Sequence, residues 1–181
     1  VIARTKEKYG YPSHIQASTG KNQKERVLEC AEILDGSLRL SASVQSLDPE
    51  VLLNVKRQNI SAEKLIEMTK VSNKLDANTY SEVILAMPGD STKKHIKTAL
   101  ILADANMKFI PLYTLMILDG SVLATEESRN QWNLKTKFRV VPRCFGAYDF
   151  GGEEILSADI EEVCVENDTL SLDDYYEARS F

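Results

Sequence analysis

The sequence has little of what would place it in several specialised protein classes. Its cysteines, Cys30, Cys144 and Cys164, are too few and too scattered for a disulfide scaffold. There is no apolar run of about 18 residues, so no membrane-spanning helix is expected, and no signal peptide is visible. The net charge of −5 disfavours a nucleic-acid surface. We therefore expect a cytoplasmic protein with no membrane or nucleic-acid partner.

What is present is typical of a globular domain. Hydrophobic residues make up 43% of the 181 positions and charged residues 27%, which suffices for a sizeable core. The chain starts at Val1 and stops within a predicted helix, which follows a capping-box pattern from Ser171 to Asp174. We therefore expect a fragment of a longer protein.

Strand and helix patterns alternate over the first two thirds of the chain. The predicted strands cover residues 14–19, 38–45, 79–87 and 109–118. The predicted helices cover residues 22–34, 49–56 and 92–106, and another begins at Ser61. This order predicts an α/β fold with parallel strands and right-handed crossovers.

The alternation ends near residue 121. We expect a helix over 126–132, a strand over 137–141, a turn over 147–152 and a solvated acidic face over 153–166. The predicted organisation is therefore a main part, residues 1–125, followed by a C-terminal α+β appendage, residues 126–181.

One strand has a polar face. Within residues 38–45, apolar side chains alternate with Arg39, Ser41, Ser43 and Gln45, and a period of two places the two sets on opposite faces. A parallel strand covered by helices on both sides would be nearly all apolar. The polar row therefore predicts a face that meets a polar ligand. Two other interpretations are open: the serines let a helix approach closely, or Gln45 bonds loop backbone.

Polar residues also occur on the neighbouring predicted strands. Gln16 and Ser18 lie on the first strand, and Glu82 lies in an apolar stretch, where a buried carboxylate needs a partner or a ligand. We expect Gln16, Gln45 and Glu82 to share the concave side of a curved sheet, with Arg57 at its rim. Taken alone, Arg57 would be a surface arginine.

The remaining candidate residues have structural interpretations. His14 and His95 are too isolated for a metal site, and His95 is expected to be solvated on a lysine-rich helix. Cys30 is expected to be a small buried hydrophobic residue. Tyr175 and Tyr176 are expected to dock the last helix onto the body.

Three segments in fixed order resemble the radical S-adenosylmethionine superfamily. They are SVQSLDPEVLLNVKR, EVILAMPGDS and IPLYTLMILDGSVL, which contain a glutamine followed twelve residues later by an arginine, then an acid on a strand that ends in M-P-G. The opening IQASTGKNQKERVLECAEIL and the later VVPRCFGAYDFGG are similar to its cobalamin-associated branch.

The resemblance implies a partial TIM-like (βα) barrel that is open at its N-terminal edge. It implies a parent enzyme that binds S-adenosylmethionine beside a 4Fe-4S cluster. Such an enzyme generates a 5′-deoxyadenosyl radical or supports cobalamin-dependent methyl transfer.

The resemblance also implies roles for individual residues. Arg57 would pair with the methionyl carboxylate, Gln45 would contact the methionyl or ribose part, and Glu82 would lie near the ribose hydroxyls or the ammonium. Gln16 or Ser18 would contact the ribose. The implied cofactor-binding set is completed by Ser43, Met87 and Pro88.

The sequence departs from the family in its cluster motif. It contains no CxxxCxxC, and cluster ligation needs cysteine thiolates. Cys144 and Cys164 are too far apart to substitute, and Gly151-Gly152-Glu153 lies too late in the chain for the family's Gly-Gly-Glu motif. The cluster ligands and any cobalamin domain are therefore expected outside this chain. Its partners would be the cofactor, a substrate and the remainder of the parent chain, and the chain alone would be inactive.

Two alternatives are open. The chain could be a non-catalytic, degenerate barrel that serves as a binding module. It could also be a fragment of an unrelated parallel α/β enzyme.

Overall fold

The computed structural model describes residues 1–17, 24–58, 62–74 and 78–181, so the candidate Ser18 lies outside the described residues. The chain forms two compact units. The first unit comprises residues 1–83 and 96–112, and the second comprises residues 84–95 and 113–181. No helix within the described ranges has both the length and the apolar composition of a membrane span.

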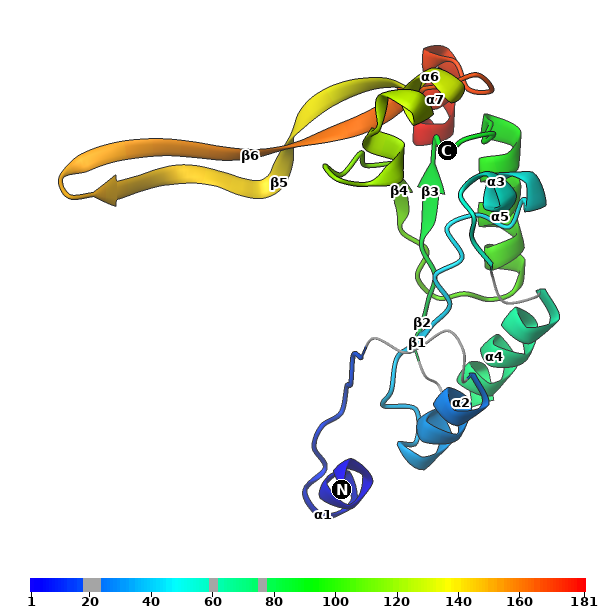
Figure 1. Ribbon diagram of the computed structural model, residues 1–181. Coiled ribbons are helices and arrows are strands. Elements are labelled where there is room, and N and C mark those ends of the chain that lie inside the picture. Colours follow the sequence, from blue (N-terminus) through cyan, green and yellow to red (C-terminus); the bar gives the residue numbers. More distant parts are fainter. Residues whose placement is uncertain (18–23, 59–61, 75–77) are drawn as a thin grey trace. The chain divides into compact units, whose positions relative to one another are not determined.

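The first unit contains most of the predicted alternation (Figure 1). Its elements are α1 (Ile2–Tyr9), α2 (Lys24–Ile33), β1 (Leu40–Ser41), α3 (Pro49–Asn54), α4 (Ala62–Lys74) and β2 (Thr79–Tyr80). Three elements continue across the unit boundary: β3 (Val83–Leu85), α5 (Thr92–Asp104) and β4 (Leu112–Thr114). The predicted helices are confirmed to within a few residues. The strand predicted over 79–87 is divided into β2 and β3.

Four segments of the first unit are joined by parallel pairing. The paired residues are Ile15 with Leu38, Leu40 with Thr79, Ser41 with Tyr80, Gln45 with Val83, and Tyr80 with Phe109. Neighbours in the sheet thus follow one another along the chain, as right-handed crossovers allow. The predicted α/β class with parallel strands is confirmed, and the described strands do not close into a barrel.

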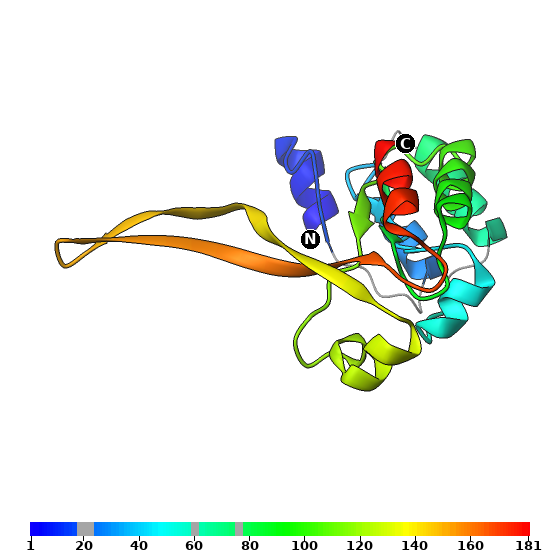
Figure 2. The ribbon, with the colours of Figure 1, turned by 90° about the horizontal axis from the view of Figure 1, so that it is seen from above.

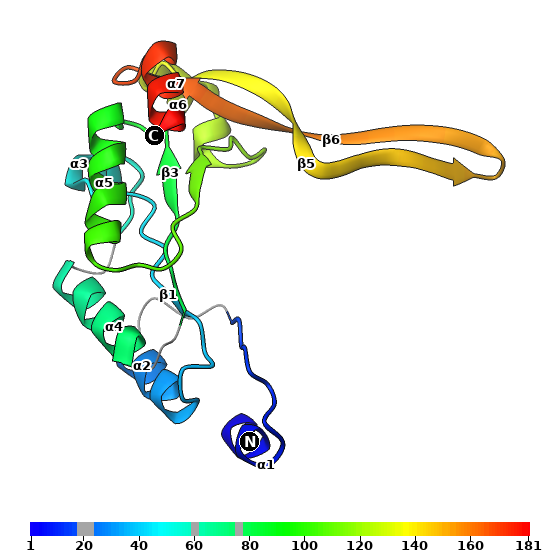
Figure 3. The ribbon, with the colours of Figure 1, turned by 180° about the vertical axis from the view of Figure 1, so that it is seen from behind.

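The core of this unit follows from the alternation in residues 38–45. Leu38, Leu40, Ala42 and Val44 are buried, whereas the polar residues between them are only partly buried. Helices α2 and α4 pack side by side, as Figures 1 and 3 show, and contribute to the same apolar cluster. Their contributions include Ala31, Leu65 and Met68.

Helix α3 begins where its sequence predicts. The Asp48 carboxylate accepts hydrogen bonds from the backbone N–H groups of Glu50 and Val51, and Pro49 occupies the first helical position. The helix is short, and the N–H of Arg57 bonds the carbonyl of Leu52 just beyond its end. This local geometry places Arg57 directly after the helix.

The second unit adds antiparallel strands to the ends of β3 and β4. Its further elements are η1 (Val122–Ala124), α6 (Glu126–Gln131), β5 (Lys135–Phe150), β6 (Glu153–Glu166) and α7 (Leu172–Ser180). Leu115 N–H bonds the carbonyl of Leu85, and Cys164 N–H bonds the carbonyl of Leu115, both at 2.9 Å. The predicted capping box of Ser171 and Asp174 is confirmed at the start of α7.

Strands β5 and β6 form a long antiparallel hairpin that extends away from α6 and α7 (Figures 1 and 2). The turn predicted over 147–152 is wrong for its first part, because residues 147–150 continue β5. Only Gly151 and Gly152 turn, with φ values of 65° and 87° that glycine tolerates. The segment 153–166, for which the sequence predicts an acidic face, is strand β6.

The predicted solvated acidic face is also partly wrong. Glu162 accepts two hydrogen bonds from Arg129, and Glu161 bonds Arg139. The pair of Arg139 and Glu161 is aligned by the register of β5 and β6, whereas the pair of Arg129 and Glu162 joins α6 to β6.

One face of the hairpin is mostly apolar along its length. Its register aligns Val140 with Ile160, Phe145 with Ala158, and Ala147 with Leu156, and alternate positions of β6 share a face. We call this the apolar face of the hairpin. Its large members are between 48% and 78% exposed and comprise Phe138, Val140, Phe145, Leu156 and Ile160.

Candidate functional site

Four of the predicted site residues lie together in the first unit. The Arg57 guanidinium donates a hydrogen bond from Nη2 to the carbonyl oxygen of Ser43, at 2.7 Å. The backbone N–H of Gln45 donates to the carbonyl oxygen of Glu82, at 2.9 Å. Strand pairing and the short helix α3 therefore bring these residues to one part of the sheet.

The carboxylate of Glu82 is held on the polar face. The Tyr80 hydroxyl donates to Glu82 Oε2 at 2.9 Å, and the hydroxyls of Ser41 and Ser43 lie 3.3 Å apart. Gln45 has a φ of 60°, a left-handed conformation that few non-glycine residues adopt. Such local strain is found more often at functional sites than elsewhere.

The charges of this cluster are opposite and partly buried. Burial lowers the pKa of Arg57, and the negative charge of Glu82 opposes that shift. A guanidinium beside a carboxylate matches a zwitterionic amino-acid group, since the guanidinium binds a carboxylate and the carboxylate binds an ammonium. The residues present can therefore bind a zwitterionic amino-acid group.

Gln16 lies elsewhere on the sheet. It is exposed and lines a hollow with Arg39 and Phe109, near the amino-terminal ends of the parallel segments. The structure thus places Gln16 beside Arg39, whereas Gln45 and Glu82 lie beside each other.

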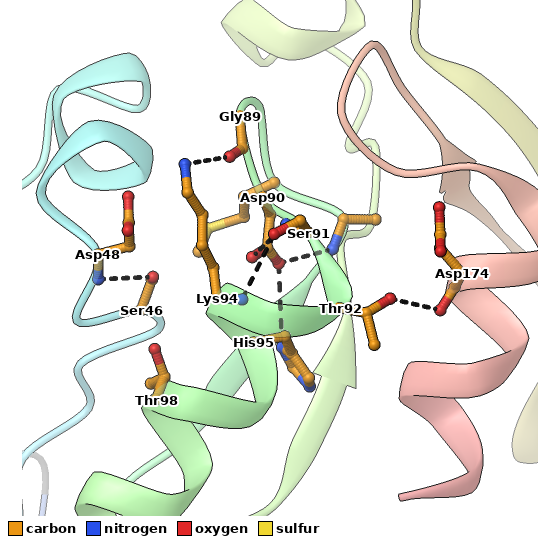
Figure 4. Close-up of polar contacts among 12 residues, drawn as sticks. Ser46, Asp48, Gly89, Asp90, Ser91, Thr92, Lys94, His95, Thr98 and Asp174 are labelled. Atoms are coloured by element: carbon orange, nitrogen blue, oxygen red, sulfur yellow. Dashed lines mark hydrogen bonds and ion pairs between the residues drawn. The ribbon is translucent and has the colours of Figure 1, made fainter.

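Met87 and Pro88 are buried in the second unit, in the turn after β3. The turn is tight, with Ala86 at φ 69° and Gly89 at φ 81°. Asp90 stabilises it, because its carboxylate accepts from the N–H groups of Ala86 (3.2 Å) and Ser91 (2.9 Å). Figure 4 shows this carboxylate, with Lys94 bonded to the Gly89 carbonyl at 2.9 Å.

Two residues that follow β6 also donate hydrogen bonds to this turn, and the sequence did not predict these bonds. The Asn167 amide donates to the carbonyls of Ala86 and Met87, both at 3.2 Å. The Thr169 hydroxyl donates to the Asp90 carbonyl at 2.6 Å. The only sequence signal was Asn167-Asp168, a turn-forming pair directly after an apolar stretch.

His95 corrects the prediction of a solvated residue. It is only 2% exposed, and its Nδ1 lies 3.9 Å from Asp90 Oδ2 without a hydrogen-bond partner among the described residues (Figure 4). Burial, aided by the charge of Arg179, lowers the pKa of His95 to about 4. Ala99 lies four residues after His95, and Leu102 lies three residues after Ala99. This helical spacing places His95 on the apolar stripe of α5.

The described residues do not fit an iron-sulfur cluster. Cys30 and Cys144 are exposed, so the expected burial of Cys30 is wrong: it lies on the solvent side of α2, next to the inward stripe. Burial raises the pKa of the Cys164 thiol to about 11, which disfavours the thiolate that a metal requires. No group of three or more His, Cys, Asp or Glu side chains in the described ranges could hold a metal ion.

Two curated proteins are similar in sequence. A cobalamin-dependent radical SAM methyltransferase, TokK, from Streptomyces tokunonensis is 27% identical over 75% of this chain. A 2-(S-pantetheinyl)-carbapenam-3-carboxylate methyltransferase from Streptantibioticus cattleyicolor is 26% identical over 99% of this chain. The aligned parts are 20% and 26% of these relatives, so the chain spans about a fifth to a quarter of their length.

Other comparisons add little. A solved structure of TsrM, a radical S-adenosylmethionine methyltransferase from Kitasatospora setae, matches 64% of this chain and 23% of its own. The identity is 14% and the TM-score 0.45. No family model matches the chain. The resemblance to cobalamin-associated radical SAM enzymes is confirmed by the similarity to TokK.

Proposed function

We propose that this chain is part of the catalytic barrel of a radical SAM enzyme of the cobalamin-associated branch, and that it binds S-adenosylmethionine. Residues 1–125 supply strands and helices of a partial barrel, open at its N-terminal edge, and residues 126–181 are an extension. The remainder of the parent chain completes the site.

The observation on which this proposal depends is the cluster around Arg57. The three positions that the family pattern assigns to the cofactor, Gln45, Arg57 and Glu82, are far apart in sequence. Backbone and side-chain bonds nevertheless join their neighbourhoods at 2.7 and 2.9 Å. This placement supports the proposal, because the family pattern assigns all three positions to one cofactor.

Each residue has a binding role in the proposal. Arg57 binds the methionyl carboxylate and also anchors itself on Ser43, which fixes its orientation. Glu82 accepts from the ammonium or the ribose hydroxyls, and Gln45 contacts the methionyl or ribose part. Met87 and Pro88 shape the backbone against the adenine.

The remaining cofactors are assigned to other parts of the parent. The cysteines here do not fit a 4Fe-4S cluster, so its ligands belong to another segment, as does a domain for cobalamin. The chemistry supplied by these groups when bound is formation of a 5′-deoxyadenosyl radical or methyl transfer. The residues of this chain bind and orient the cofactor.

The test is the affinity of the intact, reconstituted parent for S-adenosylmethionine, measured by isothermal titration calorimetry. Replacing Arg57→Ala should weaken binding by about 2 kcal/mol or more, as expected for a lost charge-assisted pair. Lys97→Ala removes an equally charged but exposed side chain from α5 and should leave the affinity unchanged.

Equal affinities of the two variants would refute the role of Arg57. Absence of both iron-sulfur absorption and 5′-deoxyadenosine formation in the reconstituted parent would refute the radical SAM assignment itself. The binding-module alternative would then be favoured if the parent still bound a ligand.

A further inference from the structure

A hollow lies in the first unit, at the amino-terminal ends of its parallel segments. Its volume is about 460 Å³, which is within the range of small-molecule sites. The residues that line the hollow lie at or near the beginning of each of the four parallel segments. The lining residues used below are His14, Gln16, Arg39, Asn78, Lys108 and Phe109.

Arg39 is oriented by aromatic rings. Its guanidinium carbon lies 4.0 Å from the centre of the Tyr80 ring and 5.5 Å from that of Phe109, and these two rings are 5.8 Å apart. A guanidinium stacked on ring faces is held in place while its N–H groups at the edge stay available for an acceptor. Within the described ranges, no carboxylate lies in ion-pair distance of Arg39.

The charged residues among the described lining of the hollow have one sign. Arg39 and Lys108 are cationic, and none of the described lining residues is Asp or Glu, although acidic residues outnumber basic ones in the whole chain by 27 to 22. Asn78 Nδ2 lies 3.0 Å from His14 Nε2, so the rim adds polar groups held in a defined position. The hollow therefore favours an anion.

One ring surface completes the site. Phe109 is 56% exposed at the edge of the hollow, beside the stacked guanidinium. A ligand with a flat ring would cover this face, and its anionic group would then lie within the reach of Arg39 and Lys108.

We propose that this hollow is a binding site for a small organic anion, in which a phosphate or carboxylate group is attached to a flat ring. The site is separate from the proposed cofactor site. Arg39 precedes Gln45 by six residues of extended chain, a span of roughly 20 Å. A bound anion would tie together the starts of the parallel segments, opposite to the end where such sheets place their active sites.

The experiment is calorimetric titration of the chain with phenyl phosphate, benzoate, inorganic phosphate and phenol. Phenyl phosphate or benzoate should bind with a dissociation constant below about 1 mM. Phenol and inorganic phosphate should each bind at least about tenfold more weakly, because phenol lacks the anionic group and inorganic phosphate lacks the ring. The stronger of the first two ligands identifies the anionic group.

Three variants test the location. Arg39→Gln and Lys108→Gln should each weaken binding about tenfold, as for a lost bond to a charged group. Lys97→Gln removes the same charge from an exposed position of α5 and should have no effect. Circular dichroism and a thermal melt establish that each variant is folded.

Two results would overturn the proposal: failure of both aromatic anions to bind at millimolar concentration, or equal affinities of the Arg39→Gln and Lys97→Gln variants. Neither result depends on S-adenosylmethionine, so the outcome is independent of the proposed function.

Discussion

The side-chain amide of Asn167 donates a hydrogen bond to the carbonyl oxygen of Ala86, at 3.2 Å, across 81 residues of sequence. Ala86 has a left-handed φ of 69°, so its carbonyl points out of the strand and needs a partner of its own. The segment after β6 thus supports the turn after β3. In the proposed function, that turn lies against the adenine.

Asn167→Ala should therefore destabilise the second unit. The substitution leaves the buried carbonyl of Ala86 without its Asn167 donor, whereas the carbonyl of Met87 keeps the bond from the Asp90 N–H. The loss costs about 1–3 kcal/mol of unfolding free energy. Urea denaturation measures this change. Asp168→Ala, an exposed neighbour in the same turn, is the control and should change stability by less than about 0.5 kcal/mol. Equal effects of the two substitutions would contradict the assigned role of Asn167.

The burial of His95 predicts a loss of stability in mild acid. Its pKa is about 4 in the folded chain and about 6.5 when unfolded, so between these values the unfolded state binds a proton that the folded state does not. The stabilisation is complete above pH 6.5 and is lost as the pH falls towards 4. At pH 5 the loss should be about 2 kcal/mol relative to pH 7.

Denaturation curves at pH 7 and pH 5 measure this loss. His95→Gln removes the titrating group and should abolish most of the difference between the two pH values. His14→Gln replaces an exposed histidine and should retain the difference. A wild-type chain equally stable at both pH values would show that His95 is not buried as a neutral group.

The ion pair of Arg129 and Glu162 should stabilise the base of the hairpin. Two parallel bonds of 2.6 and 2.7 Å join the side chains, and the bonds from Arg129 hold the pKa of Glu162 at about 2. A double-mutant cycle with Arg129→Ala and Glu162→Gln should give a coupling energy of about 1–2 kcal/mol. The more exposed pair of Arg139 and Glu161 should give about 0.5 kcal/mol. The reverse order would contradict the geometry.

Amide hydrogen exchange should be fastest in the outer half of the hairpin. Two strands alone are marginally stable in water, and the outer residues 145–158 pair with no third strand among the described residues. Residues 162–166 also bond the segment 115–117 and should exchange more slowly. Uniformly slow exchange along both strands would show that the apolar face of the hairpin is covered in solution.

The sequence predicted the first unit better than the second. The alternation in residues 38–45 and the Asp48-Pro49 cap are local patterns, and local patterns act through backbone geometry that nearby residues determine. The polar positions on the predicted strands identified Ser43, Gln45 and Glu82 as candidates, and the family resemblance added Arg57. The structure places these four residues together. Met87 and Pro88 lie in a defined turn, and their role stays a prediction.

The features that the sequence did not predict depend on partners far along the chain. Strand β5 contains Pro142 and Gly146, which locally favour a turn, yet it extends because β6 pairs with it. Lysines lie on either side of His95 in the sequence. Its burial depends instead on which face of α5 is covered by the rest of the fold. The bonds of Asn167 join segments that no short window contains.

In the first unit, the sequence by itself determined where most helices and strands form, that the strands are parallel, and which polar side chains share a strand face. Only the tertiary structure decided which of those side chains meet, how the turn after β3 is held, and that an exposed hairpin extends from the second unit. The physical reason is that periodicity and capping act within a few residues, whereas burial, ion pairing and strand pairing depend on which distant segments are packed together.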